Sequence, residues 1–231
     1  MHGKHYANIT TERREMLDAV LDMRQPDLNV FAENLHKPRN FYAMVLNCDD
    51  VGINEMQVLP GETALRKHWI TSQGAEKWMY IKSPEDIAQA CTYLKSAGFQ
   101  LVAAHLSDAA IDYHDVDYTL PTALVLGTEL FGVSDATLSY VDRQISIPMM
   151  GVTQSLNVSV ACAVVLYEAQ RQRQAAGMYD HCRLDDETLA RQRFEWLHPV
   201  LTDYCQRHGL EYPELDDAGE LAESMPRGHS T

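Results

Sequence analysis

The sequence lacks the features that mark a secreted or membrane-anchored protein. Its five cysteines are odd in number, and no two of them form a C-x-x-C pair. No apolar run approaches the roughly 20 residues of a membrane-spanning helix. No signal peptide precedes the first polar stretch. We therefore expect a reduced, cytoplasmic protein with neither a disulfide framework nor a structural zinc site.

Basic residues are scarce as well. The chain has 19 Lys and Arg against 33 Asp and Glu, which gives a formal net charge of −14. Nucleic-acid-binding proteins usually carry a basic patch, because neutralising phosphates supplies much of their affinity. Composition alone therefore favours an ordinary acidic protein, unless its basic residues gather locally.

Two cofactor classes also find no support. No G-x-G-x-x-G opens a first helix, which excludes a nicotinamide dehydrogenase of the Rossmann type. No carboxylate cluster suggests a catalytic metal, so we expect none. With 231 residues and 45% hydrophobic content, the chain has enough apolar material for a globular core.

Short apolar runs alternate with helical patterns along the chain. Strands are predicted at 28–35, 56–59, 78–81, 99–104, 121–126 and 144–147. Helices are predicted at 11–25 with Thr10 or Thr11 as cap, from Ser83 to Ala97, from Val158 onward, and at 184–208. This alternation predicts an α/β fold with a parallel sheet and helices on both faces. We expect an N-terminal helical extension at 1–25, an α/β domain at 26–178, and a helical C-terminal extension at 179–231 that ends in a weakly ordered acidic tail from Glu211.

The stretch 147–160 has the most unusual pattern. Pro148 ends an apolar strand, Gly151 permits a tight turn, and a helix that is apolar on nearly every side follows. Ser155 is the predicted cap of this helix, whose free N–H groups could bind a polar or anionic ligand. An ordinary strand-to-helix connection explains the pattern equally well.

Three segments in order resemble the signature motifs of the SPOUT-class RNA ribose methyltransferases. They are H-K-P-R-N at 36–40, G-x-E-x-x-G at 127–132, and I-P-M-x-G-x-x-Q-S-L-N-V-S-V-A-x-A at 147–163. The chain most resembles the TrmH-type tRNA guanosine 2′-O-methyltransferases, from about Thr11 to beyond Met178.

The resemblance implies a deep trefoil knot at the C-terminal end of the sheet, a homodimer through the knot region, S-adenosylmethionine as cofactor and tRNA or another structured RNA as partner. It implies cofactor contacts at Ala104, Gly127, Ile147 and Leu156, and catalytic roles for Asn40, Glu129, Ser155 and Asn157. Arg13, Arg14, Lys37 and Arg39 are the candidate RNA-binding residues. Without the resemblance, Asn40 could cap the next helix or hydrogen-bond a substrate hydroxyl, and the cap is the simpler interpretation. Glu129 would then be a solvent-facing turn residue.

The chain departs from the family pattern at one critical place. The helix after Asn40 normally carries R-T-A-D-A-x-G, and the resemblance implies that its Arg activates the ribose hydroxyl. Here Leu46 occupies that position, while Asp49 and Gly52 match. Leucine has no charge and no proton acceptor, and loss of a positioned base costs about 10²–10⁴-fold in rate. Two classes remain open: an RNA methyltransferase with a displaced base or another substrate, and a cofactor-binding, RNA-associated protein with little methyl transfer.

Overall fold

The computed structural model describes residues 9–61, 77–128, 132–153 and 155–222. The chain divides into two compact units. One spans Gln25–Asp180, and the other combines the described residues of Met1–Arg24 and His181–Thr231.

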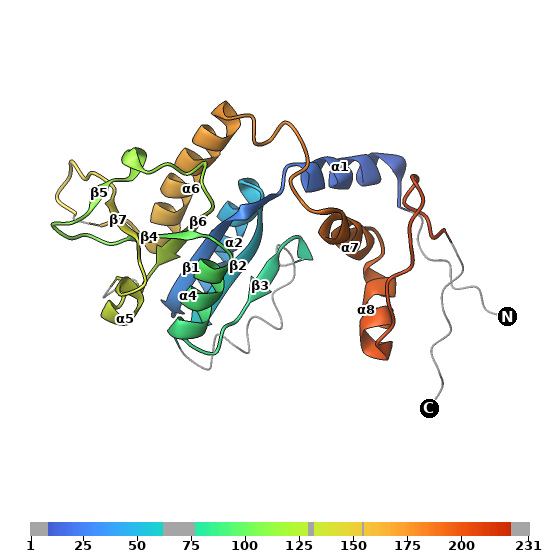
Figure 1. The fold of residues 1–231 in the computed structure, drawn as a ribbon, viewed down its shortest axis with the longest axis horizontal. Helices are drawn as coiled ribbons and strands as arrows, with labels where there is room; N and C mark the ends of the chain where they lie inside the picture. The colour runs from blue at the N-terminus through green and yellow to red at the C-terminus, as the bar shows by residue number, and fades with distance from the viewer. Residues whose placement is uncertain (1–8, 62–76, 129–131, 154, 223–231) are drawn as a thin grey trace. The chain divides into compact units, whose positions relative to one another are not determined.

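The Gln25–Asp180 unit is built on a seven-stranded sheet in which every strand pair is parallel (Figure 1). Its strands are β1 (Gln25–Leu35), β2 (Ile53–Pro60), β3 (Tyr80–Lys82), β4 (Gln100–Ala104), β5 (Ile111–Asp112), β6 (Thr122–Leu126) and β7 (Arg143–Ser146). They lie in the order β3-β2-β1-β6-β4-β7-β5. This confirms the predicted α/β fold with a parallel sheet.

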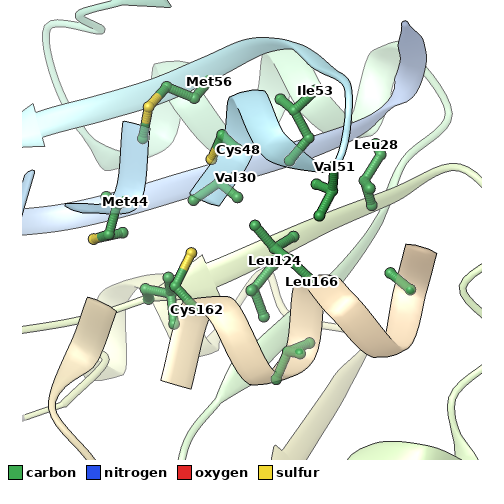
Figure 2. Packing of buried hydrophobic residues seen from close by; sticks show 14 of the residues in the cluster. Leu28, Val30, Met44, Cys48, Val51, Ile53, Met56, Leu124, Cys162 and Leu166 are labelled. Carbon is green, nitrogen blue, oxygen red and sulfur yellow. The ribbon is translucent and has the colours of Figure 1, made fainter. Parts of the chain in front are cut away.

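Helices cover both faces of this sheet. They are α2 (Pro38–Asp50), α4 (Ile87–Ser96), α5 (Asp135–Leu138) and α6 (Val158–Ala175), with a short 3-10 turn, η2, at Tyr113–Asp115. Val30 and Leu124 pack in a core cluster with residues of α2 and α6, including Cys48 and Cys162 (Figure 2). Their neighbours along the strands point the other way and pack in a second cluster with residues of α4.

The caps of two helices lie later in the chain than the sequence analysis expected. The cap of α4 is Asp86 and not Ser83, because the Asp86 carboxylate accepts the Gln89 N–H at 2.8 Å. The cap of α6 is Asn157 and not Ser155, since its side-chain oxygen accepts the Ser159 N–H at 2.9 Å. A cap must reach the second or third N–H of the helix, and only the nearer side chain does so.

The second unit contains α1 (Thr11–Asp22), α7 (Asp186–Leu197) and α8 (Pro199–His208). Thr10 caps α1 by accepting the Arg13 N–H, as predicted. The predicted single helix at 184–208 is wrong, because it breaks at His198, which has φ −127° and ψ 57°. Pro199 explains the break: proline lacks an N–H and disfavours helical geometry in the residue before it.

The acidic segment after Glu211 is also better ordered than expected, as far as residue 222. Leu215 and Leu221 form an isolated antiparallel bridge. Arg193 of α7 donates to the carbonyl oxygens of Asp216 and Asp217 at 3.2 and 3.3 Å. Backbone carbonyls, which composition does not reveal, therefore tie this acidic segment to Arg193 of α7.

Candidate functional site

A pocket of about 370 Å³ lies beside the carboxyl ends of β4, β6 and β7. Ligands of open parallel sheets bind at this edge, where the loops after the strands converge. The predicted cofactor contacts Ala104, Gly127, Ile147 and Leu156 all line the pocket. Two more lining residues, Ser155 and Asn157, come from the predicted catalytic set. One cavity therefore gathers all four predicted cofactor contacts and two of the four predicted catalytic residues.

The first and third motifs meet at the wall of this pocket. Asn157 donates its side-chain N–H to the Asn40 side-chain oxygen at 3.2 Å, although the two residues are 117 positions apart. Asn40 is 6% exposed and lies in the first turn of α2, whose N-cap position is Lys37. The helix-cap interpretation of Asn40 is therefore wrong. Its side-chain oxygen instead accepts a hydrogen bond from Asn157, in the loop that also carries Ser155.

The two ends of the second motif meet at the pocket. Thr128 and Gly132 exchange two backbone hydrogen bonds, of 2.9 and 3.0 Å. A Cβ on Gly127 would lie 1.9 Å from the Gly132 carbonyl oxygen, and Gly132 itself has φ +67°. Both positions therefore require glycine. Glu129, the predicted catalytic residue of this motif, lies outside the described residues.

Leu46 lies on the surface of α2. Its side chain is 54% exposed, and it is not among the described residues that line the pocket. The next residue, Asn47, donates its side-chain N–H to the Ser159 carbonyl oxygen at 2.9 Å and so joins α2 to α6. Burial in the core therefore does not explain the leucine at position 46.

The four candidate RNA-binding residues separate into two pairs. Lys37 and Arg39 are exposed at the start of α2, and Lys37 also lines the pocket. Arg13 is exposed on α1, whereas Arg14 donates to the Ala218 carbonyl oxygen at 2.8 Å. The pairs belong to different units.

Three polar residues of the pocket, His105, Thr128 and Ser146, were not predicted from the sequence. The His105 N–H donates to the Ile145 carbonyl oxygen at 3.1 Å, which fixes the chain as it leaves β4. A signal was available, because each of the three is the neighbour in sequence of a residue already assigned to the cofactor, namely Ala104, Gly127 or Ile147.

Two cysteines pack under the site, between α2 and α6. Burial raises the pKa of Cys48 well above its ordinary value, and a hydrogen bond with Cys162 raises it further. A thiol with a raised pKa is a poor nucleophile at neutral pH. The pair therefore contributes packing to the helix contact behind Asn40 and Asn157.

Within the described residues, no three His, Cys, Asp or Glu side chains are grouped so that they could hold a metal ion. The helices in the same part of the chain are all too short or too polar to cross a membrane.

Comparison with known proteins gives consistent matches. The SpoU rRNA methylase family profile matches residues 27–167, and the profile of the SpoU rRNA methylase C-terminal region matches 171–224. The tRNA (guanosine(18)-2′-O)-methyltransferase of Escherichia coli K12 is 42% identical over 204 residues, which cover 87% of this chain and 89% of that protein. The protein of the same name from Thermus thermophilus is 45% identical over 188 residues, which cover 81% and 97%.

Solved structures agree. The Aquifex aeolicus TrmH/SpoU tRNA modifying enzyme has a TM-score of 0.75 and 41% identity, and the match covers 82% of this chain and 97% of that one. The SpoU methyltransferase AviRb of Streptomyces viridochromogenes, solved with AdoMet, has a TM-score of 0.56 and 26% identity, with 67% and 59% covered. The chain therefore belongs to the SpoU methylase family of S-adenosylmethionine-dependent RNA methyltransferases, as its three motifs predicted.

Proposed function

We propose that this protein transfers a methyl group from S-adenosylmethionine to a ribose 2′-oxygen of tRNA, with guanosine 18 as the first candidate. The observation that carries the proposal is the Asn157–Asn40 hydrogen bond, which joins two motifs beside a cofactor-sized pocket. Relatives at 42% and 45% identity bear the name of this activity and support the choice of nucleotide.

The pocket suits the cofactor. Its volume of about 370 Å³ falls in the range of small-molecule sites. Ala104, Ile147 and Leu156 offer apolar surface for an adenine ring, and Gly127 lets a ligand approach the backbone closely. When bound, S-adenosylmethionine supplies an activated methyl group on its sulfonium, so the protein must mainly position and orient.

The remaining residues would orient the ribose. Ser155 and Asn157 line the pocket, and the Asn40 side-chain oxygen accepts a hydrogen bond that orients the Asn157 side chain. Fixing a hydroxyl in line with the methyl group converts binding energy into rate. We propose that Glu129 completes this hydrogen-bond network. The proton of the 2′-hydroxyl has no acceptor at position 46, because leucine cannot take it.

A second candidate function follows from that position. A protein that binds cofactor and RNA but transfers methyl slowly, or to another RNA, would retain the pocket and lack the base. The exposed Leu46 favours this alternative, because no packing role accounts for it.

We also propose the knotted architecture and homodimer that the resemblance implies, with the methyltransferase domain at 26–178 and helical extensions at 1–25 and 179–231. Three apolar side chains lie exposed within the third motif: Met150 at 96%, Val152 at 102% and Val160 at 46%. Exposed apolar patches mark association surfaces, and we place the dimer contact there. A tRNA substrate would place the activity in the cytoplasm.

The test is methyl incorporation from labelled cofactor into unmodified tRNA. The matched control is the same tRNA with 2′-deoxyguanosine at position 18, which lacks the accepting oxygen. Label in the first RNA and none in the second would support the proposal. Equal label in both would redirect the activity to another nucleotide, and label in neither, with the cofactor bound, would favour the second candidate.

A further inference from the structure

Glu33 is a buried carboxylate at the carboxyl end of β1, outside the proposed chemistry. It is 1% exposed, and its side chain shares a face of the sheet with Phe31, which packs in the cluster of α4. Burial raises the pKa of Cys91 on α4 to about 11, and the charge of Glu33 contributes to the rise. A carboxylate buried this deeply is unfavourable unless its oxygens accept hydrogen bonds.

The two oxygens of Glu33 accept from two different segments. Oε2 accepts the backbone N–H of Ser134 at 3.3 Å, from 101 residues further along the chain. Oε1 accepts the Asn34 side-chain N–H at 3.2 Å, and Asn34 has a positive φ of 50°. A non-glycine residue in this region is a strained position that its surroundings must hold. Glu33 is therefore placed where β1 turns toward the first motif.

Ser134 lies two residues after the second motif. Gly127, Thr128 and Gly132 line the pocket, and the Thr128–Gly132 hydrogen bonds join the two ends of the motif. Val133, the residue between Gly132 and Ser134, is 3% exposed. The chain thus leaves the pocket at Gly132 and is tied to the sheet two residues later, through the carboxylate of Glu33.

We infer that Glu33 is a positioning residue for cofactor binding: its carboxylate anchors Ser134 and so holds the Gly127–Thr128–Gly132 wall of the pocket in place. This rests on the proposed function, since the wall would contact S-adenosylmethionine. Asn34 donates to the other oxygen, so the same side chain couples the start of the first-motif loop to the segment just after the second motif.

The first experiment compares Glu33→Leu with Glu33→Gln. Leucine removes both acceptors, whereas glutamine keeps a side-chain oxygen for the Ser134 N–H. We expect Glu33→Leu to weaken S-adenosylmethionine binding, and to raise its KM, by about tenfold or more, as for a lost hydrogen bond to a charged group. The KM for tRNA should not change. Glu33→Gln should bind cofactor within about threefold of wild type.

The second experiment tests the Ser134 N–H itself. Ser134 has φ −70°, which proline can adopt, so Ser134→Pro removes the N–H without forcing the backbone. Ser134→Ala is the matched control, because it loses only the hydroxyl that caps α5. Ser134→Pro should reproduce the cofactor defect of Glu33→Leu, Ser134→Ala should not, and the double variant should be no worse than Glu33→Leu.

Calorimetry with S-adenosylmethionine, steady-state kinetics and thermal unfolding separate the outcomes. Glu55→Gln provides a control carboxylate on β2, bound by Lys82 and Tyr93, and should leave the cofactor KM unchanged. An unchanged cofactor KM in Glu33→Leu, with only a lower melting temperature or active fraction, would overturn the inference. So would normal cofactor affinity in Ser134→Pro. Wild-type protein that binds no cofactor would instead remove the proposed function, and this inference with it.

Discussion

At the residue scale, position 46 separates the two candidate functions. We predict that Leu46→Arg raises tRNA methylation by about tenfold or more, because it restores the charge that the family pattern places there. Stability should change little, since the side chain is 54% exposed. The measurement is labelled methyl incorporation, wild type against variant. Leu120→Arg adds the same charge at another apolar side chain of the same unit, 51% exposed, and should give no gain. No gain in Leu46→Arg would show that this position is not what limits the rate.

Gly127 gives a second residue-scale prediction. An alanine Cβ there would lie 1.9 Å from the Gly132 carbonyl oxygen, so the two ends of the second motif must move apart. We expect Gly127→Ala to weaken S-adenosylmethionine binding by at least about tenfold, as measured by calorimetry. Gly98→Ala is the control, because Gly98 has φ +85° with no atom within 4 Å of the added Cβ. It should lower stability by about 1–2 kcal/mol and leave cofactor binding intact. Equal cofactor affinity in both variants would contradict the assigned role of Gly127.

The motif residues were predictable because their residue types alone indicate what they can do. Glycine often marks a place where another group lies close to the backbone, and the Gly132 carbonyl does lie against Gly127. The partner of Asn40 was not predictable, since nothing local indicates a side chain 117 positions away. Glu33 was missed for the same reason: its acceptor role depends on Ser134, which only the fold brings near.

At the element scale, α6 contains a carboxylate whose pairing makes its stability depend on pH. Hydrogen bonds from Arg171 lower the pKa of Glu168, burial opposes the shift, and Gln172 lowers it further. A lowered folded-state pKa stabilises above the unfolded value of about 4.3, and this stabilisation is lost as pH falls through the folded value.

We therefore predict that Glu168→Gln is less stable than wild type at pH 7, and that the difference shrinks steadily below about pH 4. Urea unfolding of both proteins across this range is the measurement. Asp203→Asn breaks an ion pair in which both side chains are more than 60% exposed and should differ little from wild type at any pH. A Glu168→Gln difference that persists unchanged at low pH would mean that packing, not charge, is lost.

Element types were predictable, but some boundaries were not. A continuous apolar run indicated β6 correctly, because a central parallel strand is apolar on both faces. Asp86 and Asn157, and not Ser83 and Ser155, cap their helices because only their side chains are close enough to the N–H groups of the first turn. The position of that turn is not evident from the sequence. Pro199 signals the break between α7 and α8 in the sequence. The helical spacing of apolar residues continues across it, which led to the prediction of a single helix.

At the scale of the whole molecule, the acidic charge is spread over both units. Residues 25–180 hold 10 basic and 18 acidic side chains, and the rest of the chain holds 9 and 15. Charge does not segregate between units, so RNA binding must depend on local groups such as Lys37 and Arg39. The resemblance, and not composition, was therefore the source of the RNA prediction.

We predict weak tRNA binding with a shallow salt dependence. Four phosphate contacts, one for each candidate basic residue, would give a slope of log K against log salt of about −3 to −4. Lys37→Gln should reduce the slope by about one. Lys95→Gln, which removes a lysine paired with Asp142, should not change it. Binding measured from about 50 to 300 mM salt decides this, and a slope of about −8 or steeper would show many more phosphate contacts than these residues provide.

The pairing of α1 with α7 and α8 in one unit was beyond sequence reasoning, because it joins the two ends of the chain. The proposed trefoil knot likewise rests on the resemblance alone, since no hydrophobic pattern specifies how a chain is threaded.

The central claim is that the pocket formed by Ala104, Gly127, Ile147 and Leu156 binds S-adenosylmethionine. The most direct measurement is isothermal titration of the wild-type protein with this cofactor, without RNA. We predict one site per chain with a Kd of about 1 μM, which corresponds to about −8 kcal/mol. No detectable binding at millimolar cofactor would contradict the account, whatever the protein does to RNA.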